Sequence, residues 1–376
     1  MWLIKKLTNI IQLQYLLTIG TLLLLINFSG FISNLFQTIS LFAFLSIISW
    51  LITKKIRKYY NNNKFVTSYK RAVLITGCDS GFGNALAQTL NEHGFRVYAT
   101  VLDTDSDGAK KLATSARFDG MTTVLRMDVT NDEEVNAVYE QIAKELQQNG
   151  EQLWAVVNNA GLFTSGPLDW GTVDSYKRIF EVNTFGTVRV ARTFLPLIRQ
   201  SKGRIVNLVS ICGRFTSPNV SIYSMSKHAV TSFSDALRRE TTKWGIKVST
   251  IEPTIYKTPM ATTDYQFQET ERLWSETSDS VQQVYGRQYC TEFMKLSANK
   301  RFQNIYGQNI NDVIDKLVDA VRNVDPQISY EVVPNYLWSV FLFVEQLLPY
   351  ELSDWMNTNR LSSLLFPVPN ELKKRH

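Results

Sequence analysis

The chain has 376 residues, a formal net charge of +6 and three cysteines. Cys78, Cys212 and Cys290 are odd in number and widely separated, a spacing that favours neither a disulfide framework nor a zinc site, so no metal is expected. The basic residues cluster beside an apolar N-terminal stretch and at the C-terminal tail, which favours anionic lipid headgroups over nucleic acid as their partner.

Residues 1–58 are predicted to be a membrane anchor. No charged side chain occurs in residues 7–53, which is long enough for one or two transmembrane helices of about 20 residues each. A cleaved signal peptide is disfavoured, because a second apolar run follows the first with no A-x-A-like site between them. The dense basic cluster at residues 54–58 then predicts a cytosolic location for the rest of the chain. Residues 59–70 are interpreted as a linker.

A glycine loop follows the first predicted strand, residues 72–76, and precedes a helical pattern over residues 84–92. Its sequence is Gly77-Cys-Asp-Ser-Gly81-Phe-Gly83. Glycines permit a tight turn and let backbone N–H groups approach a pyrophosphate, while the helix N-terminus contributes partial positive charge. A loop in this position favours a dinucleotide site over an ordinary surface turn.

Further β-rich apolar runs alternate with stretches of helical periodicity. This alternation predicts an α/β fold of Rossmann type, a doubly wound parallel sheet covered by helices on both faces, with a helical C-terminal extension. Ligands of such folds bind beyond the C-terminal ends of the strands. The runs are residues 97–102, 123–127, 153–157, 204–209 and 247–251.

Tyr223 and Lys227 are four residues apart in a helical pattern, so their side chains share one face of the helix. A nearby cation stabilises a phenolate and lowers the tyrosine pKa, as a general acid–base requires. With Ser210 upstream, the pair indicates a proton-transfer site. The motif is common by chance and gains weight from the glycine loop that precedes it. His228 points about 100° away around the helix and is interpreted as a bystander.

Taken together in this order, the motifs resemble the short-chain dehydrogenase/reductase family over residues 71–260. The surrounding sequence resembles the branch that holds retinol, 17β- and 3α-hydroxysteroid and 3-hydroxybutyrate dehydrogenases, which implies chemistry on secondary or allylic alcohols. The residues that carry the resemblance are Thr76, Gly77, Gly81, Gly83, Asp128, Val129, Asn158, Asn159, Ala160, Gly161, Asn183, Ser210, Tyr223, Lys227, Pro253 and Thr258.

The resemblance implies four catalytic residues. Tyr223 would be the general acid–base, and Lys227 would stabilise its phenolate and bind the nicotinamide ribose. Ser210 would hold the substrate oxygen and Asn183 would maintain a water relay from Lys227. The residues expected to bind the cofactor are Gly77, Asp79, Ser80, Gly81, Phe82, Gly83, Asp103, Asp128, Val129, Asn159, Ala160, Gly161, Tyr223, Lys227, Pro253 and Thr258.

Two positions depart from the family pattern. Thr100 stands where many NAD-dependent relatives have Asp, with Asp103 three residues later, and no Arg or Lys is near to neutralise a 2′-phosphate. This favours NAD over NADP. Thr254 follows Pro253 where the family has glycine. Threonine does not readily adopt a positive φ. The backbone leading to Thr258 must therefore follow another path than in the family, or the family glycine does not have a positive φ.

Residues 261–376 are assigned to a substrate lid and a membrane-associated extension. Trp274, Tyr285 and Tyr289 are candidate lining residues, with ordinary core as the alternative. Residues 335–349 are too short to span a membrane and fit an interfacial or substrate-channel helix as well as a core helix. The tail at residues 373–376 resembles a dilysine retrieval signal of the endoplasmic reticulum, the alternative being a solvated charged terminus.

The predicted function is a membrane-anchored NAD(P)-dependent oxidoreductase of a lipophilic alcohol, steroid or retinoid in type, at the endoplasmic reticulum and facing the cytosol. A mitochondrial membrane is the alternative location. A 3-hydroxybutyrate dehydrogenase-like enzyme is the second hypothesis, with Arg214 as the anchor for a carboxylate. A catalytically idle membrane scaffold is the third. The physiological substrate, the direction of reaction and a homodimer are left open.

Overall fold

In this computed structural model the structure describes residues 64–114, 117–118, 120–298, 306–358 and a few isolated positions: 17–18, 37–42, 44–46, 48–49, 52–53 and 369. The chain divides into two compact units, Met1–Lys64 and Phe65–His376. Within the described residues, no helix has both the length and the apolar character needed to cross a membrane. Most of the anchor predicted over residues 1–58, and the tail at 373–376, lie outside the described residues.

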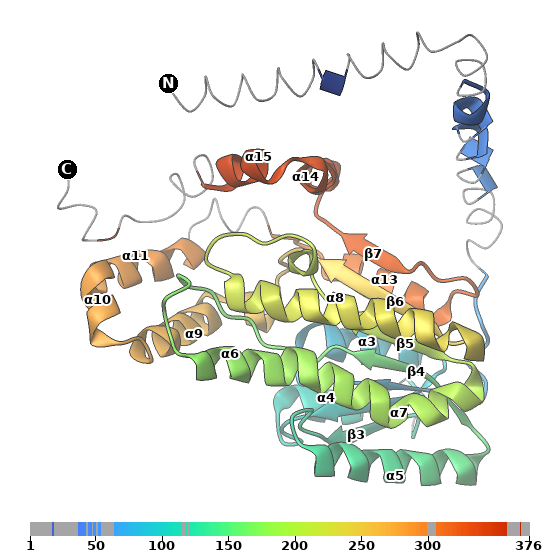
Figure 1. The fold of residues 1–376 in the computed structure, drawn as a ribbon. Coiled ribbons are helices and arrows are strands. Elements are labelled where there is room, and N and C mark those ends of the chain that lie inside the picture. Colours follow the sequence, from blue (N-terminus) through green and yellow to red (C-terminus); the bar gives the residue numbers. More distant parts are fainter. Residues whose placement is uncertain are drawn as a thin grey trace. The chain divides into compact units, whose positions relative to one another are not determined.

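A parallel sheet of seven strands forms the centre of the second unit, in the order β3-β2-β1-β4-β5-β6-β7 (Figure 1). Every neighbouring pair of strands is parallel. The strand order reverses between β1 and β4, the point at which doubly wound folds bind ligands. The strands are β1 (Arg71–Ile75), β2 (Arg96–Val101), β3 (Thr122–Arg126), β4 (Gln152–Asn158), β5 (Arg204–Leu208), β6 (Lys247–Pro253) and β7 (Ser329–Val332).

Helices cover both faces of the sheet, as the alternation of runs predicts (Figure 1). Successive residues of β1 point to opposite faces, so Val73 and Ile75 enter one apolar core while Ala72 and Leu74 enter the other. The first core is closed by α3 (Gly81–Glu92), α4 (Asp107–Thr114) and α13 (Asn311–Arg322). The second is closed by α5 (Asp132–Asn149), α7 (Thr187–Ser201) and α8 (Ser221–Thr241).

The sheet continues beyond residue 260, where the predicted core ends. β7 pairs with β6, and α13 buries Val313, Leu317 and Val321 in the first core. Part of the segment assigned to the lid and extension therefore completes the sheet and its first apolar core. Sequence alone did not show this, because β7 has only four residues and its burial alternates.

The end of the predicted linker also packs on the domain. Phe65 forms an antiparallel bridge with Asn323, and the backbone N–H of Val66 donates to the carbonyl of Arg322 at 2.8 Å. The Arg322 guanidinium lies 4.6 Å from the centroid of the Phe65 ring. Residues 65–66 are thus part of the folded unit.

A helical cap follows β6. It consists of α9 (Thr263–Ser275), α10 (Asp279–Tyr285) and α11 (Arg287–Ala298). The cap packs around Trp170, whose ring makes edge contacts with Trp274, Tyr285 and Tyr289 at centroid distances of 4.8, 5.6 and 5.9 Å. These three aromatic residues, predicted as candidate lining residues, belong instead to an aromatic core. After β7 come α14 (Tyr336–Leu347) and α15 (Tyr350–Trp355).

Candidate active site

A cavity of about 1130 Å³ lies at the C-terminal ends of the strands. Its walls come from the glycine loop, the segments that follow β2 to β6, the cap helices α9 and α11, and α14. The carboxyl ends of parallel strands meet at one edge of a sheet, so residues far apart in sequence gather here. Among the described residues, no cluster of three or more His, Cys, Asp or Glu side chains could hold a metal ion.

The glycine loop has the geometry of a phosphate cradle. Gly77 and Gly81 have φ values of +69° and +59°, which favour glycine. A Cβ at Gly77 would lie 2.8 Å from Cα of Ala160, and one at Gly83 would lie 2.4 Å from the carbonyl oxygen of Gly77. The side chain of the N-cap residue Ser80 makes no capping hydrogen bond, which leaves the first-turn N–H groups of α3 for an anion. The loop therefore fits a dinucleotide pyrophosphate.

The acidic side chain at the end of β2 comes from the glycine loop. Asp79 lines the cavity, and its Oδ1 accepts the backbone N–H of Leu102 at 3.0 Å. Thr100 is fully buried inside β2, and its hydroxyl donates to the Ile75 carbonyl. Asp103 is not among the residues that line the cavity, and its carboxylate accepts the N–H of Asp105 at 2.8 Å. Asp79, and not Asp103, thus lines the cavity next to the end of β2.

Asp128 and Val129 line the cavity after β3, as expected. Asp128 Oδ1 accepts both the backbone N–H and the hydroxyl of Thr130, each at 2.8 Å. Its own N–H donates to Glu134 Oε2 at 2.8 Å, which ties the turn to the first turn of α5. The carboxylate is therefore held in a fixed orientation at the cavity wall.

Asn159, Ala160 and Gly161 follow β4 and line the same cavity. The Asn159 amide donates to the carbonyls of Thr76 and Gly77, both at 2.8 Å. The N–H of Ala160 donates to the Thr76 hydroxyl at 3.0 Å. Asn159 therefore acts on the site by fastening the glycine loop to the end of β4.

Three of the four predicted catalytic residues meet in one place. Along α8, Tyr223 and Lys227 lie one turn apart, with Lys227 Nζ 5.7 Å from the centroid of the tyrosine ring. Lys227 Nζ also donates to the Leu208 carbonyl at 3.0 Å. Ser210 caps a short 3₁₀ turn: its Oγ accepts the N–H of Cys212 at 3.1 Å and donates to the Pro253 carbonyl at 3.2 Å. All three line the cavity.

Burial controls the protonation of this group. It raises the pKa of Tyr223 above its ordinary value, Cys212 raises it further, and a hydrogen bond with Ser210 partly opposes this. Burial lowers the pKa of Lys227 to about 8. Burial also raises the pKa of the Cys212 thiol. The cofactor-free site thus holds Tyr223 as the neutral phenol, which differs from the depressed tyrosine pKa expected from the spacing of Tyr223 and Lys227.

Asn183 lies in a π-helical turn, Glu181–Gly186, that joins α6 (Val173–Phe180) to α7. Its Oδ1 accepts the N–H of Leu162 at 2.7 Å, and its Nδ2 donates to the Leu162 carbonyl at 2.9 Å. The same amide donates to Ser226 Oγ at 3.0 Å. The side chain therefore holds the backbone after Gly161 against α8. The water relay expected of Asn183 stays a prediction. Helical periodicity did not reveal the π turn, which is typical of functional sites.

The segment after β6 completes the cofactor side of the cavity. Pro253 and Thr258 line it, and a Cβ at Gly81 would lie 3.6 Å from Cβ of Thr258. Thr254 is not among the described non-glycine residues with positive φ, so the chain passes this point without a left-handed residue. The departure at Thr254 therefore places no strain on the loop that carries Thr258.

The far side of the cavity is largely apolar. α14 turns Trp338 and Phe341 inward, and the Phe341 ring packs edge-on against Phe215 at 5.9 Å. Only Leu342 of this helix is buried, so α14 lies at the cavity wall and is not a core helix; its role as a substrate-channel or interfacial helix stays a prediction. Most of these residues belong to no local sequence pattern that relates them to the motifs, so they could not be predicted from the sequence. The apolar lining residues are Leu162, Phe163, Ile211, Phe215, Ile255, Met260, Phe293, Met294, Leu337, Trp338 and Phe341.

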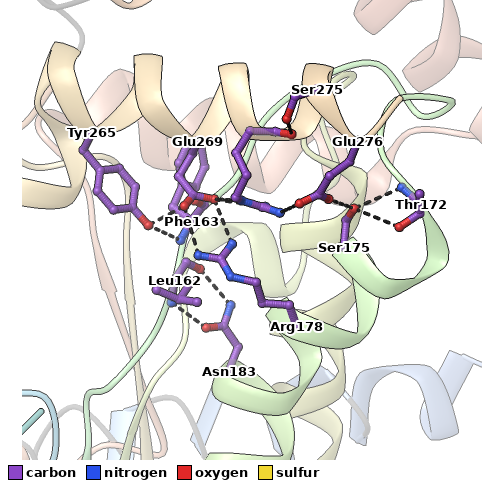
Figure 2. A network of polar contacts seen from close by, with 11 residues as sticks. Leu162, Phe163, Thr172, Ser175, Arg178, Asn183, Tyr265, Glu269, Ser275 and Glu276 are labelled. Atoms are coloured by element: carbon purple, nitrogen blue, oxygen red, sulfur yellow. Dashed lines mark hydrogen bonds and ion pairs between the residues drawn. The ribbon is translucent and has the colours of Figure 1, made fainter. Parts of the chain in front are cut away.

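Both arginines near the substrate side are paired with carboxylates. Arg178 lines the cavity and forms a two-pronged ion pair with Glu269, with both N···O distances at 3.0 Å (Figure 2). Arg214, predicted as a carboxylate anchor, does not line the cavity; it pairs with the buried Glu252. A buried carboxylate needs a counter-charge, and Arg214 supplies it to Glu252 of β6, so Arg214 is not available to bind a substrate carboxylate.

The comparisons with known proteins agree with this geometry. A family model described as short chain dehydrogenase matches residues 71–269. The chain is 39% identical to D-beta-hydroxybutyrate dehydrogenase, mitochondrial, of Bos taurus, over 71% of this chain and 78% of that protein. It is 35% identical to estradiol 17-beta-dehydrogenase 2 of Rattus norvegicus, over 79% and 77%. It is 38% identical to 17-beta-hydroxysteroid dehydrogenase type 6 of Bos taurus, over 76% and 87%.

Solved structures share the fold. The crystal structure of a short chain dehydrogenase/reductase from Burkholderia phymatum in complex with NAD superimposes with a TM-score of 0.60. It has 23% sequence identity and covers 75% of this chain and 95% of that one.

Proposed function

This chain belongs to the short-chain dehydrogenase family, and we propose that it is an NAD-dependent oxidoreductase of a lipophilic alcohol. Its relatives by name act on hydroxybutyrate or on steroids. The proposed substrate is a secondary or allylic alcohol of steroid or retinoid class, interconverted with its carbonyl.

One observation carries the choice of a lipophilic substrate. The cavity beside Tyr223 and Ser210 has an apolar far wall, and of its described lining residues only Arg178 and Lys227 carry positive charge. Arg178 is paired with Glu269, and Lys227 lies beside Tyr223, the proposed general acid–base. A small carboxylate would therefore lose its hydration without gaining an ionic partner among these residues, whereas an apolar body would gain from burial.

The cofactor side supports NAD. The N–H groups at the start of α3 would bind the pyrophosphate, and Asp79 would lie at the adenosine end, where its charge would disfavour a 2′-phosphate. Asp128 would bind near the adenine. When bound, NAD supplies the acceptor or donor of hydride at the substrate carbon.

The protein's own residues would handle the proton. Ser210 Oγ would hydrogen-bond the substrate oxygen, and Tyr223 Oη would take the hydroxyl proton during oxidation or return it during reduction. Burial opposes ionisation of Tyr223, so positive charge must be present when the phenolate forms. Lys227, protonated below about pH 8, would supply part of that charge.

We also propose that the protein works at a membrane. The uncharged residues 7–53 and the exposed apolar side chains of α14 support this, since a lipid-dissolved substrate could enter beside α14. The endoplasmic reticulum, with the catalytic unit facing the cytosol, is the proposed location, and a mitochondrial membrane is the alternative.

Two alternative functions are distinguished by the experiment described below. A 3-hydroxybutyrate dehydrogenase-like activity is favoured by the bovine relative that shares 39% identity. That hypothesis needs Arg214 to bind the substrate carboxylate, but Arg214 is paired with Glu252. A catalytically idle scaffold is disfavoured by the presence of all four expected catalytic residues.

The test is the formation of NADH from NAD, or of NADPH from NADP, by detergent-solubilised protein with hydroxysteroids, retinol and 3-hydroxybutyrate. Tyr223→Phe should lower turnover by roughly a hundredfold to ten-thousandfold, the usual contribution of a general base. Tyr139→Phe, a tyrosine that packs on Phe194 in the second core, is the matched control. Turnover of 3-hydroxybutyrate alone would select the first alternative, and no tyrosine-dependent turnover of any substrate would favour the scaffold.

A further inference from the structure

The backbone of Leu162 and Phe163 is held between the catalytic helices and the cap. On the inner side, Asn183 binds both the N–H and the carbonyl of Leu162, at 2.7 and 2.9 Å. On the outer side, the Tyr265 hydroxyl of α9 meets the N–H and the carbonyl of Phe163, at 3.4 and 3.3 Å (Figure 2). These four groups belong to three consecutive peptide units, and the middle unit, between Leu162 and Phe163, is held by Asn183 through its carbonyl and by Tyr265 through its N–H.

Phe163 carries this constraint to the catalytic tyrosine. Its ring lies 5.0 Å from the Tyr223 ring, centroid to centroid, at an interplanar angle of 72°. Edge-to-face pairs of this kind have a preferred geometry, so a displaced Phe163 would leave the phenol less well oriented and more accessible to water. Tyr265 is not among the residues that line the cavity, whereas Phe163 is. The backbone of Phe163 is therefore a route from Tyr265 to the phenol, in addition to the direct electrostatic effect by which Tyr265 raises the pKa of Tyr223.

Ion pairs hold α9 in the position that this contact requires. Glu269, one turn after Tyr265, pairs with Arg178 of α6 and with Arg272 of its own helix. Arg272 also pairs with Glu276, which accepts a hydrogen bond from Ser175 of α6 (Figure 2). The Glu269 side chain is only 12% exposed, so this pair is screened less than one at the surface. The cap and α6 are thus fastened beside Tyr265.

We propose that Tyr265 is a positioning residue for Tyr223: the cap orients the catalytic phenol by holding the Phe163 backbone with the Tyr265 hydroxyl. This inference rests on the proposed function of Tyr223. It makes the orientation of the phenol depend on the position of α9.

A double-mutant cycle tests the route from Tyr265 to Tyr223. Tyr265→Phe removes the hydroxyl and keeps the ring, and we expect the single-turnover rate of hydride transfer to fall about tenfold, with KM for NAD unchanged. Phe163→Leu should lower the rate by a similar factor. Because both act through one contact, the double variant should be little slower than either single variant. Multiplied effects, or a change confined to KM for the alcohol, would overturn the proposal.

Hydrogen exchange gives a readout that needs no turnover. In the full chain, Tyr265→Phe should speed amide exchange in the segment around residues 161–165, because the Phe163 N–H loses its partner. Glu269→Gln should produce the same change by loosening α9. The matched control is Glu271→Gln, on the same helix, which breaks an equally two-pronged but exposed ion pair with Arg287. Unchanged exchange in Tyr265→Phe would overturn the proposal, even if Tyr223→Phe had confirmed the role of the tyrosine.

Discussion

At the scale of single residues, the buried lysine controls how the site responds to pH. Burial lowers the pKa of Lys227 from 10.5 to about 8. Between these values the unfolded chain binds a proton that the folded, cofactor-free protein does not, so this group makes stability rise with pH across that window. Below about pH 8 the cost of the buried charge is complete, on the order of 3 kcal/mol.

Lys227→Met should remove that pH dependence. We expect the melting temperature of the variant, relative to wild type, to be highest below pH 8 and to decline between pH 8 and 10.5. The lost hydrogen bond to the Leu208 carbonyl is the same at every pH, so it shifts the whole curve without changing its slope. Thermal unfolding without cofactor measures this, and a difference that stays constant with pH would contradict the lowered lysine pKa.

Cofactor choice is also a single-residue matter. Asp79 lines the cavity with its Oδ1 fixed by the Leu102 N–H, whereas Asp103 lies off the cavity. Asp79→Asn keeps an oxygen acceptor and removes the charge. We expect the preference for NAD over NADP in kcat/KM to fall about tenfold, equivalent to about 1.4 kcal/mol. Asp103→Asn, the control, should leave the preference unchanged. The reverse pattern would return the role to the residue that the sequence pattern suggested.

At the scale of elements, α14 has two apolar faces with different surroundings. Phe341 packs inward on Phe215 and lines the cavity, whereas Phe343 is 63% exposed. Phe341→Ser should raise KM for lipophilic alcohols about tenfold and leave KM for NAD unchanged, because only the substrate wall is altered. Phe343→Ser should keep KM in detergent and weaken binding to phospholipid vesicles. Steady-state kinetics measures KM, and vesicle sedimentation measures membrane binding. An unchanged KM for alcohols in Phe341→Ser, or unchanged vesicle binding in Phe343→Ser, would contradict the role given to that face of α14.

At the scale of the whole molecule, the described residues that line the cavity all lie in the second compact unit, Phe65–His376. We expect a fragment of residues 65–376 to keep NAD-dependent turnover in detergent within about threefold of the full chain, because the two cores of the sheet remain complete. The fragment should leave the membrane fraction more readily. Loss of NAD binding would show that residues 1–64 contribute to the site, and unchanged membrane retention would argue against an anchor there.

Local patterns were enough to predict the α/β class, the strands from β1 to β6, the glycine loop and the tyrosine–lysine pair. These features depend on the periodic spacing of apolar residues along a strand or helix and on the i, i+4 spacing within one helix. Residues that are close in the sequence specify both. β1 and β6, for example, lie within two residues of their predicted bounds. Contacts between distant segments decided the rest. Three examples depend on partners from other elements, which sequence spacing does not specify. Asp79 of the glycine loop binds the backbone after β2, Arg214 pairs with Glu252, and Trp274 packs in the aromatic core.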